Sequence, residues 1–447
     1  MSIEEAVDED SKQNHNSRLT YEGCNVLLDI NDGDRLVFSR LTAASTLKIG
    51  NKKCSLQPLI GCPFGSLFQV EPGKEGTFLT RFVENAEGNG LEEKDVDGSK
   101  DNRALVDNNT AQSLTSEDID EMRKQGAKGD EIVEALIANS ATFEKKTLFS
   151  QDKYRVKKQK KYAPRVLLRR PFARSICEAY FKKHPEKIGF MRVDALSLLL
   201  SLGNVTANAD VLVVDMLSGI LTGAIAERLG AGTGYVCNTY RGSSPYPVDI
   251  TRMFNLSDEI CKRIVHASLT DLNSFQTGAS VSEGQEETLP VTHSGGLDEV
   301  SVPAEDGGMD VTPERVSSPI IKPVKSIKAG QKATLEAIKS WKENGFSSLI
   351  IAAPELDPWG IIKEVLPLLS FSAPFAVYHQ YAQPLATCMH NLQIEKMAIG
   401  LQISEPWLRE YQVLPSRTHP HMQMSAFGGY ILSGTKISSS DSLTSSN

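Results

Sequence analysis

The densest group of chemically distinctive side chains is a run of positive charge between Lys153 and Arg170. It reads KYRVKKQKKYAPRVLLRR and contains no acidic residue. Its nine cations are Lys153, Arg155, Lys157, Lys158, Lys160, Lys161, Arg165, Arg169 and Arg170. Cations at this density neutralise several phosphates at once and release the counterions condensed on them. The run therefore predicts binding to a nucleic acid, and RNA is the favoured kind.

Two other interpretations of this run stay open. A solvated helix face also carries many cations, and Lys157-Lys158-Gln159-Lys160-Lys161 suffices as a nuclear localisation signal. The run is long and joins two predicted folded units, which favours nucleic acid over a solvated face. A nuclear signal is compatible with nucleic-acid binding, so we expect the protein in the nucleus.

A second place where chemistry is expected is the turn after the apolar run that ends at Asp215. In an open parallel sheet, a cofactor lies beyond the carboxyl end of the first strand, where a glycine-rich turn lets the backbone approach it. Rossmann-like methyltransferases have an acidic residue there, followed by glycines at alternate positions. This chain keeps Asp215 and Gly219, but Leu217 and Leu221 stand where glycines are expected. Their side chains would occupy the space that S-adenosylmethionine needs.

Two further requirements of such a site are also unmet. The next predicted strand is followed by Asn238-Thr239-Tyr240-Arg241, which offers no carboxylate to the ribose hydroxyls. The run SSLIIAAP ends in Ala352-Ala353-Pro354, where a polar residue would orient the base, and Asp357 lies a few residues too late. We therefore expect no catalytic residue and no bound cofactor in this chain.

These positions belong to a region in which strands and helices alternate, beginning after Pro171. A helix is expected from Asp194 to Leu202, a strand ending at Asp215 and a helix from about Leu221 to Leu229. The strands GTGYVCN, SSLIIAAP, PFAVYHQ and KMAIGLQI, the helix GIIKEVLPLL and the β segment HMQMSAFGGYILSG complete the pattern. Such alternation predicts a mostly parallel sheet covered by helices on both faces.

The preceding region divides into a β unit and a pair of helices. Short apolar runs separated by turns, from Asn25 to Val70, predict a small antiparallel barrel or meander. A first helix opens at Thr115 or Ser116, with Asp118 placed for a capping box, and a second has an apolar face. A DNA-reading helix-turn-helix is the alternative to a packing hairpin, but neither helix has a basic face.

The predicted boundaries follow these changes of pattern. They are a disordered tail (1–18), the β domain (19–83), a flexible linker (84–110), the helical hairpin with the basic segment (111–170), the α/β domain (171–434) with a disordered insertion (271–328), and a second tail (435–447).

Composition limits the remaining possibilities. The net charge of −8, from 48 Lys and Arg against 56 Asp and Glu, argues against a nucleic-acid partner only as an average, because the acids concentrate at 3–10, 84–101 and 283–310. Seven scattered cysteines without a CxxC pair predict neither disulfides nor a metal site. The acidic start and the lack of a long apolar run predict no signal peptide and no membrane segment.

Several long segments resemble a known family. They are Asp101-Asn102-Arg103 with the hairpin up to Ser140, Phe149 to Tyr162, Leu202-Gly203-Asn204-Val205, Trp407 to Pro420, and Gly428-Gly429-Tyr430. Over most of its length the chain resembles the non-catalytic subunit of eukaryotic tRNA (adenine-58-N1)-methyltransferase. The resemblance implies an N-terminal β-barrel-like domain, followed by a Rossmann-like class I methyltransferase fold with a degenerate cofactor site.

The resemblance also implies partners. A catalytic tRNA (adenine-N1)-methyltransferase subunit would bind S-adenosylmethionine, the assembly would be a dimer of heterodimers, and tRNA would lie across both subunits. Two rival functions stay open. One is an active RNA methyltransferase with a divergent cofactor turn, and the other is an RNA-binding translation or processing factor without a methyltransferase partner.

Overall fold

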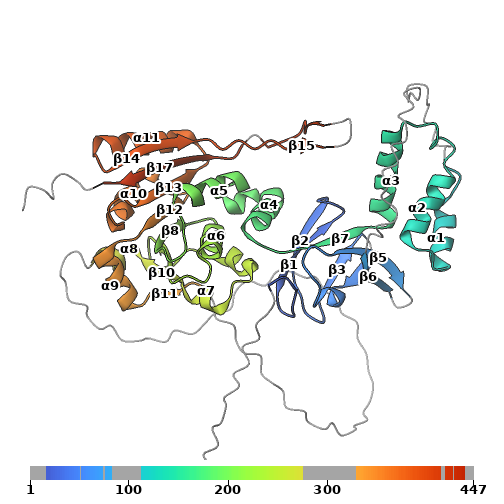
Figure 1. The fold of residues 1–447 in the computed structure, drawn as a ribbon, viewed down its shortest axis with the longest axis horizontal. Coiled ribbons are helices and arrows are strands. Elements are labelled where there is room, and N and C mark those ends of the chain that lie inside the picture. Colours follow the sequence, from blue (N-terminus) through green and yellow to red (C-terminus); the bar gives the residue numbers. More distant parts are fainter. Residues whose placement is uncertain are drawn as a thin grey trace, which may run out of the picture.

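The computed structural model describes residues 17–50, 52–73, 76–82, 112–274, 329–413, 418–425 and 427–437. The predicted linker and most of the predicted tails and insertion lie outside these residues. Figure 1 shows an α/β unit beside a smaller β unit, and a group of three helices at the far side of the β unit. Within the described residues, no helix is both long and apolar enough to cross a lipid bilayer.

The α/β unit is built on a sheet of eight strands. Their order is β11 (Gln331–Lys332), β10 (Ile264–Ser268), β9 (Val236–Tyr240), β8 (Val211–Asp215), β12 (Ser348–Ala352), β13 (Pro374–His379), β17 (Tyr430–Lys436) and β14 (Ala398–Ser404). Only β17 runs antiparallel to its two neighbours, and the other pairs in this sheet are parallel. This order, with one antiparallel strand inserted near the edge, is that of class I methyltransferases, so the predicted Rossmann-like fold is confirmed.

Helices cover both faces of this sheet. They are α4 (Ala173–Lys183), α5 (Val193–Leu202), α6 (Ile220–Leu229), α7 (Asp258–Lys262), α8 (Leu269–Asn273), α9 (Leu335–Asn344), α10 (Pro358–Val365) and α11 (Ala382–Ile394), with 3-10 turns η3 (Pro185–Ile188), η4 (Asp249–Phe254) and η6 (Leu366–Leu368). Alternate residues of a strand face opposite sides. Val211 and Val213 therefore enter the core beneath α5 and α6, whereas Leu212 and Val214 enter the core beneath α9 to α11. Burial on both faces explains why β8 is apolar up to Asp215.

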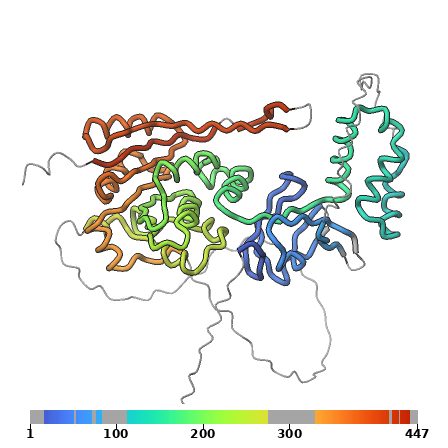
Figure 2. Tube along the Cα trace, in the orientation of Figure 1, coloured from blue at the N-terminus to red at the C-terminus, as the bar shows by residue number. Residues whose placement is uncertain are grey.

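The β unit is a curled sheet of seven strands. The order is β2 (Arg35–Arg40), β1 (Asn25–Ile30), β7 (Arg165–Arg169), β5 (Leu67–Gly73), β6 (Gly76–Phe82), β4 (Lys52–Ser55) and β3 (Thr46–Ile49), and η1 (Gln57–Leu59) precedes β5. Most pairs are antiparallel, but β4 and β6 meet in parallel at Cys54 and Thr77. Strand β7 comes from the basic segment and pairs with both β1 and β5. Figure 2 shows it running from the helices through this sheet to α4.

The three helices are α1 (Ser116–Lys124), α2 (Gly129–Ala138) and α3 (Leu148–Tyr162). The predicted capping box of the first helix is confirmed, because Thr115 Oγ1 accepts from the Asp118 N–H at 3.3 Å and Asp118 Oδ2 accepts from the Thr115 N–H at 2.8 Å. Ile132, Val133 and Leu136 are the buried apolar face expected of α2. The basic segment adds the third helix, which packs against α2.

Candidate functional site

The predicted cofactor turn lies at the carboxyl end of β8, where Asp215 is fully buried. One carboxylate oxygen accepts from the Leu217 N–H at 2.9 Å, and the other accepts from the N–H and the hydroxyl of Thr222 at 2.9 and 2.8 Å. Burial raises the pKa of this carboxyl, and the hydrogen bonds from Thr222 and Leu217 partly oppose that rise. Both oxygens of the acid therefore bind the chain's own turn and the first turn of α6.

The two leucines of the turn are core residues. Leu217 and Leu221 are buried in the cluster beneath α5 and α6. Leu217 packs closely against the backbone of Gly189, since a Cβ added to that glycine would lie 2.8 Å from Leu217 Cδ2. The side chains predicted to occupy the turn are thus part of the packed interior.

A segment that sequence analysis did not single out covers the middle glycine of the turn. Gly219 has φ +89°, and a Cβ added to it would lie 2.6 Å from the Cα of Val248. The Thr251 hydroxyl donates to the Gly219 carbonyl at 2.8 Å, and the Ile250 N–H donates to the Ser218 carbonyl at 2.9 Å. The start of η4 and the residue before it therefore lie directly on the backbone of the turn.

The other polar residues considered for this site have partners within the chain. Asn238 is buried and accepts from the Asp215 N–H at 3.3 Å. Arg241 forms an ion pair with Glu364 of α10. Asp357 caps α10, because its carboxylate accepts from the Gly360 N–H at 2.7 Å. In the part of the chain that the structure describes, no group of three or more His, Cys, Asp or Glu residues could hold a metal ion.

The basic segment divides into a helical part and a strand part. Six of its nine cations lie on α3, which buries none of its residues. Lys153, Lys157, Lys160 and Lys161 follow the spacing i, i+4, i+7 and i+8, which places them along one side of the helix. Sequence analysis predicted the charge but not the helix that arranges it.

Tyrosines interleaved with these cations hold lysines in place. The ring of Tyr154 has the ammonium groups of Lys146 and Lys158 at 5.3 and 5.1 Å from its centroid. Phe143 meets the same ring edge-on at 5.8 Å, and the amide of Gln112 donates to the Tyr154 hydroxyl at 3.2 Å. This ring therefore gathers two positive charges at one place on α3.

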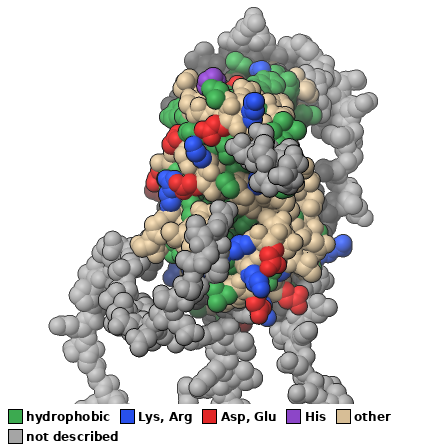
Figure 3. All heavy atoms as spheres, turned by 90° about the vertical axis from the view of Figure 1, so that its left-hand side faces the viewer, with side chains coloured by type: hydrophobic (Ala, Val, Ile, Leu, Met, Phe, Trp, Pro, Cys, Tyr) green, Lys and Arg blue, Asp and Glu red, His purple; other side chains and the backbone are tan. Residues whose placement is uncertain are grey.

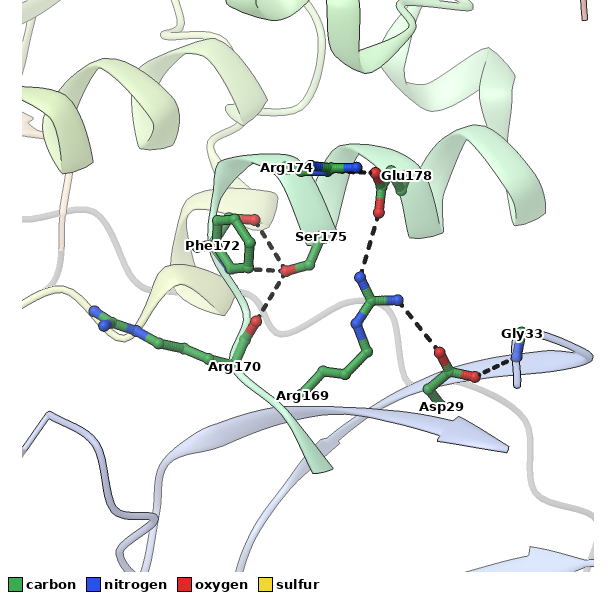
Figure 4. Close-up of polar contacts among 8 residues, drawn as sticks. All are labelled: Asp29, Gly33, Arg169, Arg170, Phe172, Arg174, Ser175 and Glu178. Atoms are coloured by element: carbon green, nitrogen blue, oxygen red, sulfur yellow. Dashed lines mark hydrogen bonds and ion pairs between the residues drawn. The ribbon is translucent and has the colours of Figure 1, made fainter. Parts of the chain in front are cut away.

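The three arginines of the strand part are dispersed. The guanidinium of Arg165 lies 4.1 Å from the centroid of the Phe82 ring. Arg169 contacts Asp29 of β1 and Glu178 of α4, each at 3.3 Å, and so ties the β unit to the α/β unit (Figure 4). The carbonyl of Arg170 accepts from the Ser175 hydroxyl at 2.9 Å in the same view. The structure thus brings together the six predicted cations of α3. Arg165 lines a pocket together with Lys160, whereas Arg169 and Arg170 contact residues of α4.

Comparison with known proteins identifies relatives over most of the chain. The Gcd10p family model matches residues 20–295. The tRNA (adenine(58)-N(1))-methyltransferase non-catalytic subunit trm6 of Dictyostelium discoideum is 35% identical over 427 residues, which covers 94% of this chain and 80% of that protein. The subunit of the same name from Mus musculus is 33% identical over 454 residues, covering 93% of this chain and 89% of that protein.

A solved structure of a SAM-dependent O-methyltransferase from Thermotoga maritima is also similar. It is 11% identical, with a TM-score of 0.46, and the match covers 94% of this chain and 96% of that one. Membership of the family is shown by the sequence matches.

Proposed function

The chain belongs to the Gcd10p family, and from this premise we propose that it is the non-catalytic, tRNA-binding subunit of a tRNA (adenine-58-N1)-methyltransferase. A catalytic partner subunit binds S-adenosylmethionine and transfers the methyl group. This chain supplies affinity for tRNA and a scaffold for the partner.

The non-catalytic role is supported by the contacts of the cofactor turn, whose acid and glycine are occupied by other residues of the same chain. An acidic residue and a bare glycine backbone are the features that this fold offers to a nucleoside cofactor. Here both oxygens of Asp215 hold the turn and α6, and Val248 lies against Gly219. Leu217 and Leu221 are buried in the core beneath α5 and α6. These contacts support a turn that is closed to S-adenosylmethionine.

The observation that supports tRNA binding is the exposed charge of α3. Lys153, Arg155, Lys157 and Lys161 are exposed, and no acidic side chain interrupts the helix after Asp152. By contrast, acidic and basic side chains are interspersed at the end of the α/β unit away from the β unit (Figure 3). Contacts from α3 would go mainly to phosphates, so they would add affinity with little dependence on sequence.

A protein partner is supported by a two-stranded arm that extends from the end of β14 and leads back to β17. The arm contains β15 (Tyr411–Gln412) and β16 (His419–Pro420), and it projects from the α/β unit in Figure 1. Trp407 and Met422 on it are 67% and 91% exposed, and exposed apolar groups of this kind mark interaction sites. We assign the arm to contact with the catalytic subunit.

The base of this arm is held by one buried side chain. Arg192 forms a two-point ion pair with Asp194, at 2.7 Å for each bond, and donates to the carbonyls of Pro406 and Ser425. It therefore ties both chain segments at the base of the arm to the start of α5.

We further propose that the complex is a dimer of heterodimers. We also propose that the protein resides in the nucleus and that the lysines of α3 serve as its localisation signal.

The test is a titration of the purified full chain with S-adenosylmethionine by calorimetry, followed by reconstitution with the catalytic subunit. We expect no saturable binding and no methylation of tRNA by the chain alone, and both activities in the complex. Saturable micromolar binding to the isolated chain would instead support an active enzyme with a divergent turn. Purification of the endogenous protein without any methyltransferase subunit would support an independent RNA-binding factor.

A further inference from the structure

A cavity of about 580 Å³ lies between the β unit and the three helices, at the C-terminal end of α3. This inter-unit cavity is lined by segments that are far apart in the sequence. Its charged lining residues are Arg35, Arg123, Lys160, Lys161 and Asp34. Four cations thus face one acid around a space of the size that ligands occupy in proteins. Two of these cations, Arg35 and Arg123, lie outside the basic segment.

The walls of the inter-unit cavity are fixed by hydrogen bonds and close packing. Asn31 donates to the Lys160 carbonyl at 3.1 Å and accepts from the Arg165 N–H at 3.1 Å, which joins the β1–β2 turn to the end of α3. The Gln69 amide donates to Asp130 at 2.8 Å, which joins β5 to α2. A Cβ on Gly129 would lie 2.6 Å from the Tyr162 carbonyl oxygen, so α2 starts in direct contact with the end of α3. The walls of the cavity are therefore held in place by contacts within the chain, and such pre-organisation lowers the cost of binding a ligand.

One aromatic ring gathers two of the cations. The guanidinium of Arg123 and the ammonium of Lys161 lie 5.5 and 5.0 Å from the centroid of the Tyr162 ring. Arg123 also pairs with Asp120 at 3.0 Å. Arg35 donates to the Lys48 carbonyl at 2.8 Å, and one such bond does not exhaust the five donors of a guanidinium. Both arginines are therefore oriented by the protein and still able to donate to an anion.

Asp34 is the acidic residue in the lining of the cavity, and it offsets part of the positive charge of the four cations. Asp34 Oδ1 lies 2.8 Å from Lys160 Nζ, and this pair is half exposed. Ile30, Val70 and Ile132 also line the space, and an apolar wall strengthens the field of nearby charges. Removing the charge of Asp34 would release Lys160 to a ligand and raise the net positive charge of the cavity.

We propose that the inter-unit cavity binds a phosphate group of the tRNA backbone. The backbone reaches the cavity from the lysine stripe of α3, which consists of Lys153, Lys157, Lys160 and Lys161. Lys160 and Lys161 belong both to the lysine stripe and to the lining of the cavity. A single tRNA strand can therefore contact the stripe and the cavity together. A guanidinium can bind a phosphate through two parallel hydrogen bonds. Arg35 offers a guanidinium from the β unit, and Arg123 offers one from α1. The inference rests on the proposed tRNA-binding role and adds a fixed phosphate position to it.

The test measures tRNA affinity of the complex reconstituted from the full chain and the catalytic subunit, as a function of salt. Arg123→Gln and Arg35→Gln should each weaken binding by about three- to tenfold and lower the salt slope of log K by up to about 0.9. Asp34→Asn should strengthen binding by a similar factor. The matched control is Lys124→Gln, because Lys124 is exposed beside Arg123 on α1 and does not line the cavity. Of these variants, Lys124→Gln should change the tRNA affinity of the complex least.

Opposite effects of the two kinds of substitution distinguish a phosphate site from a structural role. Arg123 also packs on Tyr162, so its replacement can disturb the helices, whereas Asp34→Asn keeps the size of a side chain in an exposed turn. Unchanged or weaker binding by Asp34→Asn, with Arg123→Gln no worse than Lys124→Gln, would overturn the proposal. That result does not affect the outcome of the S-adenosylmethionine titration, which tests the proposed non-catalytic role separately.

A second measurement separates the tRNA backbone from a free phosphate compound. Inorganic phosphate is titrated into the complex without tRNA, at constant ionic strength. We expect only weak binding of inorganic phosphate. Tight binding that Arg123→Gln abolishes, together with unchanged tRNA affinity in that variant, would assign the cavity to a small phosphate compound and contradict the proposal.

Discussion

The carboxyl end of β8 and the C-terminal end of α3 are two places where a ligand could lie, and they are filled in opposite ways. At β8 the acid binds its own backbone, two leucines are buried and Val248 lies on the glycine. At α3 the chain leaves a cavity of about 580 Å³ lined by four cations. The fold is that of a methyltransferase, whereas the ligand surface that we propose lies on the β unit and its helices rather than at the carboxyl end of β8.

This difference teaches that a fold and its usual site are separable. The contacts of the turn after β8 also hold α6 and η4, so the closure that we propose for this turn would add to the core of the α/β unit. The turn after β8 is where a substitution should have the largest effect.

The largest effect is expected from Leu217→Gly, which removes a buried side chain from the turn. It should lower the free energy of unfolding by about 3–5 kcal/mol, because the space left behind is lined by packed neighbours. It should not create affinity for S-adenosylmethionine, since Leu221 and Val248 still occupy the turn. Denaturant unfolding and calorimetry measure the two quantities.

The matched control for Leu217→Gly is Leu335→Gly, because Leu335 is 71% exposed at the start of α9. Its loss of stability should be about 1 kcal/mol, which is the effect of glycine in a helix. Measurable S-adenosylmethionine affinity in Leu217→Gly would show that the turn is open once one side chain is removed, and the comparison of the two regions would fail.

A smaller effect is expected from Asp215→Asn. The amide can accept at one position only, so at least one donor of Thr222 or Leu217 loses its partner, and stability should fall by about 1–3 kcal/mol. Thermal or denaturant unfolding at several pH values gives the result. An equally stable variant would mean that the acid does not hold the turn.

The same variant makes a prediction about pH. Burial raises the folded-state pKa of Asp215 above its ordinary value of 3.8, so the folded protein holds this proton more tightly than the unfolded chain. The contribution of Asp215 to stability should therefore be complete below that ordinary value and fall as the pH rises through the folded-state pKa. The stability difference between the native protein and Asp215→Asn should be larger in acid than at neutral pH. A difference that grows with pH would contradict the raised pKa.

Arg169 and Arg170 are adjacent cations of the basic segment that should behave differently. Arg169→Ala removes the contacts to Asp29, which is buried, and to Glu178, so stability should fall by about 1–2 kcal/mol. Arg170→Ala alters an exposed side chain and should change stability by less than about 0.5 kcal/mol. Chemical denaturation measures both. Equal stability of the two variants would show that Arg169 is no more structural than its neighbour.

Local patterns allowed much of the fold to be predicted from the sequence. The strand that ends at Asp215, the helix from Asp194 to Leu202 and the capping box at Thr115 depend on neighbouring residues, and each is present. The family resemblance predicted from long segments is confirmed by the family match and by the relatives at 33–35% identity.

What could not be predicted depends on residues far apart in the chain. Strand β7 pairs with β1, and Arg169 contacts Asp29 across 140 positions. The cover of Gly219 comes from Val248, in a loop without periodicity. The inter-unit cavity needs Arg35, Arg123 and Lys161 from three separate segments, so no single stretch of sequence indicates it.

The central claim is that this chain contributes tRNA affinity to a complex in which the partner holds the cofactor. The most direct test replaces Lys157, Lys158, Lys160 and Lys161 by Ala in the reconstituted complex, after circular dichroism has verified folding. We predict a higher apparent Michaelis constant for tRNA, similar for different tRNAs, and a salt slope lowered by up to about 0.9 per lost phosphate contact, with unchanged affinity for S-adenosylmethionine. Unchanged tRNA affinity and an unchanged salt slope would contradict the claim, and the RNA site would have to lie on another surface.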